Sequence, residues 1–70
     1  MKLSHMLDHL NTNLSEIDND YRYSVKKIKG LYKLYRTELK TGKTEEASRK
    51  DLDIENIKDL IRAVARVELT

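Results

Sequence analysis

The chain has 70 residues and a mass of 8.2 kDa, enough for one small domain. It contains no cysteine, which excludes a disulfide framework, a thiolate metal site and a thiol nucleophile. No apolar run approaches the roughly 18 residues of a membrane span and no signal-peptide pattern opens the chain, so we expect a cytoplasmic protein. Because so short a chain buries little core, we also expect it to oligomerise.

The first predicted element is a long helix. Apolar residues recur at steps of three and four from the start of the chain, at Leu3, Leu7, Leu10, Leu14, Ile17, Tyr21, Val25, Ile28, Tyr32, Tyr35 and Leu39. A spacing that averages 3.5 residues is typical of coiled coils and predicts one helix over 2–40. Residues 11–13 are poor helix sequence, and Asn13 and Glu16 have capping-box spacing. The alternative is therefore a short helix over 2–10 and a longer one over 14–40.

The second predicted element is a shorter helix after a polar loop. Gly42 tolerates the left-handed conformation that ends helices, so the first helix should stop there. A polar loop over 41–52 follows, and Asp51 or Asp53 would cap a helix over 54–69. The buried face of that helix is predicted to be Ile54, Ile57, Leu60, Ile61, Val64 and Val67. The predicted fold is all-α: a single domain over 1–70, built as a helical hairpin or three-helix unit that oligomerises into a helical bundle.

Self-association follows from the unequal lengths of these helices. The final helix would be about 24 Å long, at ~1.5 Å per residue, and cannot cover the whole of the first. The uncovered seam consists of Leu3, Leu7, Leu10, Leu14, Ile17 and Tyr21. An exposed leucine-rich seam is not a stable endpoint. We therefore expect a homo-oligomer through this seam, with a dimer favoured.

The net charge of +2 conceals a strong segregation along the chain. Residues 1–20 carry one base and four acids, residues 21–43 eight bases and one acid, and residues 44–70 five bases and seven acids. Within the middle segment, bases at helical spacing form a ridge beside the seam: Arg22, Lys26, Lys29, Lys33, Arg36 and Lys40. In an antiparallel hairpin, Lys40 would face Asp53, and Arg36 and Lys33 would lie near Glu55 and Asp59. The chain would then neutralise the loop end of the ridge itself.

The other end of the ridge would meet further bases and not acids. A basic helix with interleaved tyrosines can bind phosphates. We therefore expect a nucleic acid, DNA in the first place and RNA as the alternative, to bind through Arg22, Lys26, Lys27, Lys29, Lys33, Arg36, Arg62 and Arg66. The predicted function is a non-enzymatic regulatory or accessory protein, of the kind found in phages and plasmids with AT-rich genomes. The alternative is a protein–protein interaction module (an inhibitor, adaptor or antirepressor) that acts through the Leu-rich seam or the acidic N-terminal face.

Catalytic and metal chemistry have little support in the sequence. His5 and His9 stand four residues apart with Asp8 beside them, a spacing that can bind a divalent metal. Two solvated histidines near a helix end are the simpler interpretation. A catalytic acid or base needs a desolvated pocket, and a core this small leaves little room for one. We expect no catalytic residues and no cofactor.

Overall fold

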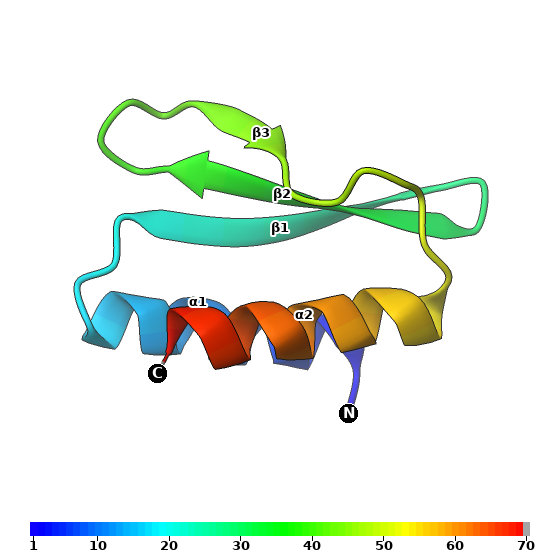
Figure 1. The fold of residues 1–70 in the computed structure, drawn as a ribbon, viewed down its shortest axis with the longest axis horizontal. Coiled ribbons are helices and arrows are strands. Elements are labelled where there is room, and N and C mark those ends of the chain that lie inside the picture. Colours follow the sequence, from blue (N-terminus) through cyan, green and yellow to red (C-terminus); the bar gives the residue numbers. More distant parts are fainter. Residues whose placement is uncertain (70) are drawn as a thin grey trace.

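The computed structural model describes residues 1–69 and shows a two-layer α+β fold. Helix α1 (Leu3–Glu16) is followed by strands β1 (Tyr21–Ile28), β2 (Leu31–Glu38) and β3 (Thr44–Glu46) and by helix α2 (Ile54–Glu68). The strands form one antiparallel sheet in the order β1-β2-β3, and both helices lie on the same side of it (Figure 1). The predicted all-α fold, with its coiled coil and helical bundle, is therefore wrong.

Residues 21–38 form a β-hairpin where the second half of the predicted long helix should lie. The register pairs Tyr23 with Arg36 and Val25 with Leu34, and the side chains of Tyr23 and Leu34 are buried. Tyr and Val are favoured in strands, and burial of alternate residues is the pattern of a sheet with one covered face. The helical spacing in this segment is coincidental, because Ile28 lies on the opposite face from these buried residues.

The hairpin closes through two residues in the left-handed region. Lys29 has φ 52° and Gly30 has φ 78°, the pattern of a two-residue type I′ turn. The twist of this turn matches the twist of the paired strands. An added Cβ at Gly30 would meet nothing within 4 Å, so glycine is needed here for its conformation alone.

Helix α1 is continuous through residues 11–13, so neither predicted version of the first half is right. The hydrogen bonds of the Asn11 side chain explain why a poor helix former occupies this position. Its side chain donates to the carbonyl oxygen of Tyr23 at 2.9 Å and accepts from the Tyr23 amide at 2.8 Å. Because β1 is an edge strand, this amide side chain supplies partners that a further strand would otherwise provide.

The end of α1 is a Schellman motif. Asp18 has φ 55°, and its amide donates to the carbonyl of Ser15 at 3.1 Å. The amide of Asn19 donates to the carbonyl of Leu14 at 2.9 Å. These two bonds satisfy carbonyl groups that the end of a helix leaves unpaired, and the chain then turns towards β1.

Helix α2 ends one residue short of its predicted bounds and begins where expected. Asp53 is its N-cap, with a side-chain oxygen that accepts from the Asn56 amide at 2.9 Å. On the predicted buried face, Ile57 and Ile61 are buried, Leu60 and Val64 pack beside them, and Ile54 and Val67 are exposed.

Gly42 has the expected left-handed φ of 71°, but it turns the chain between β2 and β3. The predicted loop over 41–52 contains β3.

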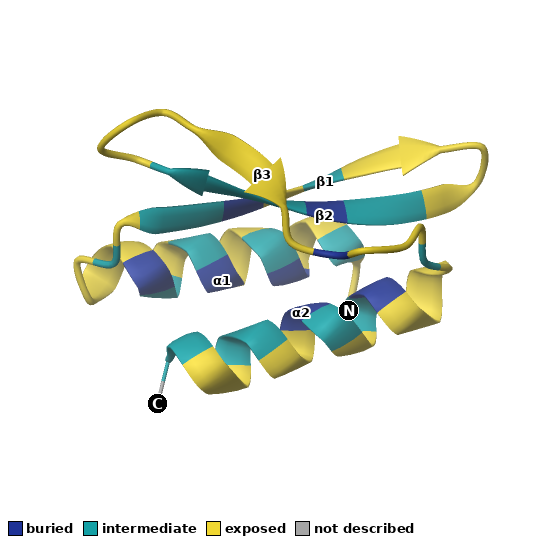
Figure 2. Ribbon diagram, turned by 45° about the horizontal axis from the view of Figure 1, so that its top comes forward, coloured by how far each residue is buried: buried dark blue, intermediate teal, exposed yellow. Residues whose placement is uncertain are grey.

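The core lies between the sheet and the two helices, where Figure 2 shows buried residues on the facing surfaces. It consists of Met6, Leu10, Leu14, Tyr23, Leu34, Ile57 and Ile61. The predicted uncovered seam is therefore largely internal. Leu10 and Leu14 are buried, Leu3, Leu7 and Tyr21 pack against the core, and Ile17 is 55 % exposed. Self-association stays a prediction, but this seam no longer supports it.

No helix within residues 1–69 is long and apolar enough to cross a membrane.

Candidate nucleic-acid interface

The sheet presents its second face, away from the helices, to solvent. Buried Tyr23 and Leu34 mark the inner face, and side chains alternate between faces along each strand. The outer face of the β1–β2 hairpin therefore carries Arg22, Ser24, Lys26, Ile28, Leu31, Lys33, Tyr35 and Thr37. This face has three bases and no acid on its two long strands. The neighbouring strand β3 adds Glu46 to the same face, beside Lys33.

The end of the hairpin is exposed on both faces. Every residue from Lys26 to Leu31 is exposed, and we call this segment the hairpin tip. Figure 2 shows it as the exposed end of the two long strands. The tip holds the lysines at positions 26, 27 and 29 and two apolar side chains, Ile28 at 51 % and Leu31 at 40 % exposure. Exposure of both faces means that the helix layer does not cover this part of the sheet.

The lysines of the tip have no ion pair within residues 1–69. The ammonium of Lys26 lies 5.2 Å from the centroid of the Tyr35 ring, and that of Lys27 lies 5.7 Å from the centroid of the Tyr32 ring. Such contacts orient a lysine without neutralising its charge. Three neighbouring ammonium groups thus remain available to an anion at one end of the molecule.

Three other bases of the predicted ridge are paired with acids, but with other partners than the sequence suggested. Lys33 pairs with Glu46 of β3 at 3.1 Å, and Lys40 pairs with Asp20 at 3.4 Å. Arg36 pairs with Glu45. The expected pairs with the acids of the final helix are wrong, because β3 and not α2 lies beside β2.

Arg36 lies on the inner face and belongs to the packing of the sheet. Its guanidinium carbon is 4.4 Å from the centroid of the Tyr21 ring, and Tyr23 is its cross-strand neighbour. Glu45 raises the pKa of Arg36, and Arg36 lowers the pKa of Glu45. Burial raises the pKa of Tyr23, and the nearby Glu68 adds to this, while Arg36 opposes it. These partners hold Arg36 in place and away from the outer face.

The remaining predicted bases are distributed over other parts of the molecule. Arg22 lies at the far end of the outer face and donates to the carbonyls of Asn19 and Tyr21 at 2.8 and 2.6 Å. Arg62 pairs with Asp59 on α2 at 2.7 Å, and Arg66 lies one turn further along the same helix. Because α2 packs on the inner side of the sheet, the fold does not bring these two arginines to the outer face.

Sequence reasoning missed the apolar part of this surface. It placed Ile28 and Tyr35 in a helical seam. The available signal was the pair Lys29-Gly30 between two tyrosine-containing runs, which is the place of a hairpin turn.

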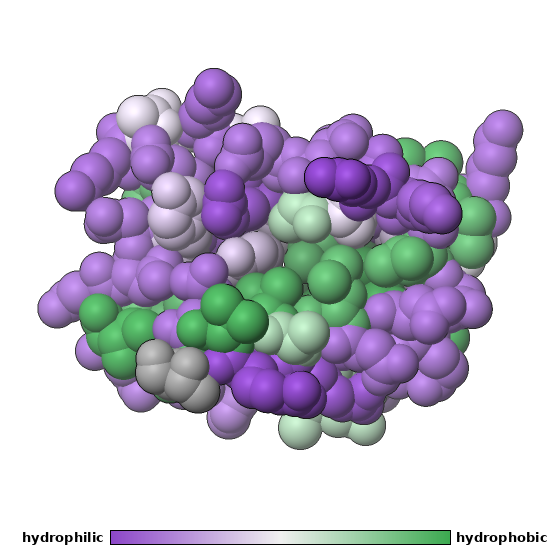
Figure 3. Space-filling view, viewed as in Figure 1, coloured by the Kyte–Doolittle hydropathy of each residue, from purple (hydrophilic) through white to green (hydrophobic). Residues whose placement is uncertain are grey.

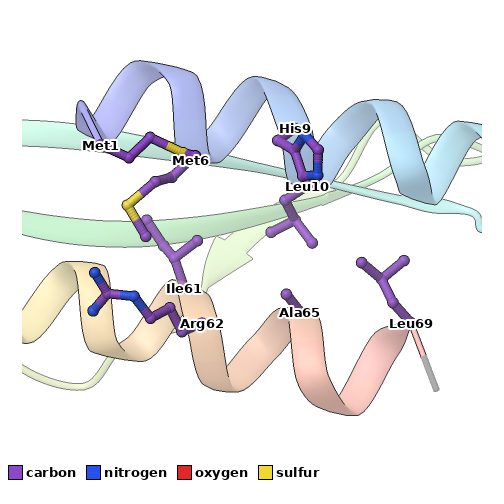
Figure 4. Close-up of a pocket in the computed structure, with 8 residues that line it drawn as sticks. All are labelled: Met1, Met6, His9, Leu10, Ile61, Arg62, Ala65 and Leu69. Carbon is purple, nitrogen blue, oxygen red and sulfur yellow. The ribbon is translucent and has the colours of Figure 1, made fainter.

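The helix side of the molecule carries an apolar groove between α1 and α2 (Figure 4). Its volume is about 380 Å³, and it is lined by Met1, Met6, His9, Leu10, Ile61, Arg62, Ala65 and Leu69. Figure 3, which views the α2 side, shows a band of hydrophobic atoms between the sheet and this helix.

His5 and His9 are exposed, and no cluster of three or more His, Cys, Asp or Glu residues within the described chain could hold a metal.

The sequence and the structure were compared with protein-family models, curated proteins and solved structures, and none of them matches this chain.

Proposed function

We propose that this protein binds nucleic acid through the hairpin tip and the adjoining outer face of the sheet. The observation that carries the proposal is the group of three lysines, Lys26, Lys27 and Lys29, at a doubly exposed hairpin end without an ion pair in the described chain. In the cytoplasm, such a protein would act as a small non-enzymatic regulatory or accessory factor.

The physical argument rests on phosphate binding. Like charges close together repel, and the fold pairs Lys33, Arg36 and Lys40 with acids but leaves the lysines of the tip without an ion pair in the described chain. A phosphate backbone brings anions at regular spacing, and each lysine that contacts a phosphate releases a condensed counterion. Binding therefore gains free energy from a charge cluster that residues 1–69 leave without an ion pair.

The test replaces these lysines and a matched set elsewhere. The triple variant Lys26→Gln/Lys27→Gln/Lys29→Gln removes the tip charges. The control Lys2→Gln/Lys43→Gln/Lys58→Gln changes the net charge by the same amount at positions outside the tip. Fluorescence anisotropy with labelled nucleic acid, titrated at several salt concentrations, reports both affinity and salt slope.

The tip variant should lose most of its affinity, and the slope of log K against log salt should become shallower by about 2.7, at ~0.9 for each lost phosphate contact. The control should retain the wild-type slope. Equal losses in the two triple variants would show attraction by net charge alone and contradict a site at the tip. Undetectable binding by the wild-type chain would reject the function.

A further inference from the structure

We infer, on the basis of the proposed function, that the ligand is B-form duplex DNA and that the hairpin tip enters its major groove. The juxtaposition of two features leads to this inference. Ile28 and Leu31 face each other across the turn on the outer face, and lysines stand on both strands beside them. A surface with apolar side chains at its extremity and cations behind them suits a groove whose floor is bases and whose walls are phosphates.

The dimensions of the tip suit the major groove. Two paired strands are about 4.8 Å apart, and with their side chains they fill a groove about 12 Å wide, which admits a two-stranded β-ribbon. At the base of the tip, Leu52 of the segment that leads into α2 pairs with Tyr32 of β2 through two backbone hydrogen bonds of 2.7 Å. The two-stranded end that can enter the groove is therefore Ile28–Leu31, closed by the turn at Lys29 and Gly30.

The chemistry of the tip assigns roles to its side chains. Ile28 and Leu31 would contact thymine methyl groups, which only the major groove displays. Lys26 flanks them on the outer face and can reach either phosphates or the O6 and N7 acceptors of guanine, whereas Lys33 is paired with Glu46. Lys27 and Lys29 lie off that face and would contact the phosphates of the groove wall.

Other nucleic acids fit this surface less well. The major groove of an A-form RNA duplex is too deep and narrow for side chains to read. Single strands bind by stacking on aromatic rings. Within the described hairpin, Tyr35 is the one tyrosine on the outer face, and Lys26 already lies over its ring. The surface therefore lacks the row of open rings that a single strand needs.

The experiment compares three probes of one sequence by anisotropy: a short DNA duplex, the corresponding RNA duplex and one DNA strand. The DNA duplex should bind at least about tenfold more tightly than either other probe. Methyl green, which occupies the major groove, should displace the protein, and netropsin, which occupies the minor groove, should not. RNA-duplex or single-strand binding of equal affinity would overturn the inference, as would displacement by netropsin alone. If all three probes fail to bind, the proposed function itself fails.

A pair of uncharged variants isolates the apolar contact. Ile28→Thr/Leu31→Thr keeps the strand preference and the charge of the tip. The control Ile17→Thr/Leu39→Thr changes two side chains of similar exposure, 55 % and 52 %, at other places on the surface. The tip double variant should bind the DNA duplex about tenfold more weakly with the salt slope unchanged. Unchanged affinity in both double variants would overturn groove insertion while leaving phosphate binding intact.

Discussion

The substitution Gly30→Ala distinguishes the hairpin from a helix, because the two structures predict opposite signs. In the turn, Gly30 has φ 78°, and a Cβ there meets no neighbouring atom, so the penalty is purely conformational. An L-residue in the left-handed region costs about 1–2 kcal/mol. For a domain of this size, ~1 kcal/mol corresponds to about 4–8 °C, so the melting temperature should fall by roughly 4–16 °C. In a helix, the same change would stabilise by about 0.5–1 kcal/mol.

Thermal unfolding followed by far-ultraviolet circular dichroism measures this difference directly. Lys29→Asn is the matched control, because asparagine tolerates positive φ and Asn-Gly is the preferred pair in a type I′ turn. The control should melt at or above the wild-type temperature. A melting temperature that rises in Gly30→Ala would refute the turn and, with it, the placement of the three lysines at a hairpin end.

Three further predictions concern the elements that position the hairpin. Asn11→Ala should destabilise the fold by about 1–3 kcal/mol in urea denaturation, because both backbone groups of Tyr23 lose their hydrogen-bond partner. Asn13→Ala on the same helix should not destabilise it. Equal effects of the two substitutions would count against the Asn11 bridge. Asp18→Gly should raise the melting temperature, since glycine adopts the left-handed conformation at the helix end without strain, and a decrease would contradict that assignment. The lowered pKa of Glu45 means that its pair with Arg36 stabilises the fold above the ordinary carboxyl pKa near 4.3 and is lost as the pH falls through the lowered value. Glu45→Gln should therefore be less stable than the wild-type chain at pH 7 and lose less stability on acidification, and parallel acid profiles would exclude the effect.

The second helix was predictable because its signals are local. Asp53 and the spacing of Ile57 and Ile61 lie within one short segment, and they specify a cap and a buried face without knowledge of the partner. The Asn11 bridge was not predictable, since its meaning depends on an edge strand twelve residues away. In isolation, an asparagine within a helical pattern indicates only a weak helix former.

The residues of the candidate site also differ in how far the sequence could predict their grouping. Lys26, Lys27 and Lys29 are close together in any conformation, so charge patterning alone identified them. The predicted cluster of these lysines with Arg62 and Arg66 required a particular packing of two helices. That packing does not occur, because the lysines lie on a β-hairpin. Local clusters of charge survive an error in fold class, whereas clusters assembled from distant segments do not.

The residues that concealed the hairpin are also those that distinguish its surface. An antiparallel sheet with one solvated face normally alternates apolar and polar residues, and this alternation is the signal of a strand. Ile28, Leu31 and Tyr35 break it by placing apolar groups on the solvent side, and two of them complete the apparent helical spacing. The core gains nothing from them there, and exposed apolar groups on an open sheet favour association. Places where a sequence departs from the local rules of its own fold are where a binding surface is expected. Here that departure coincides with the three lysines of the tip, which have no ion pair within residues 1–69.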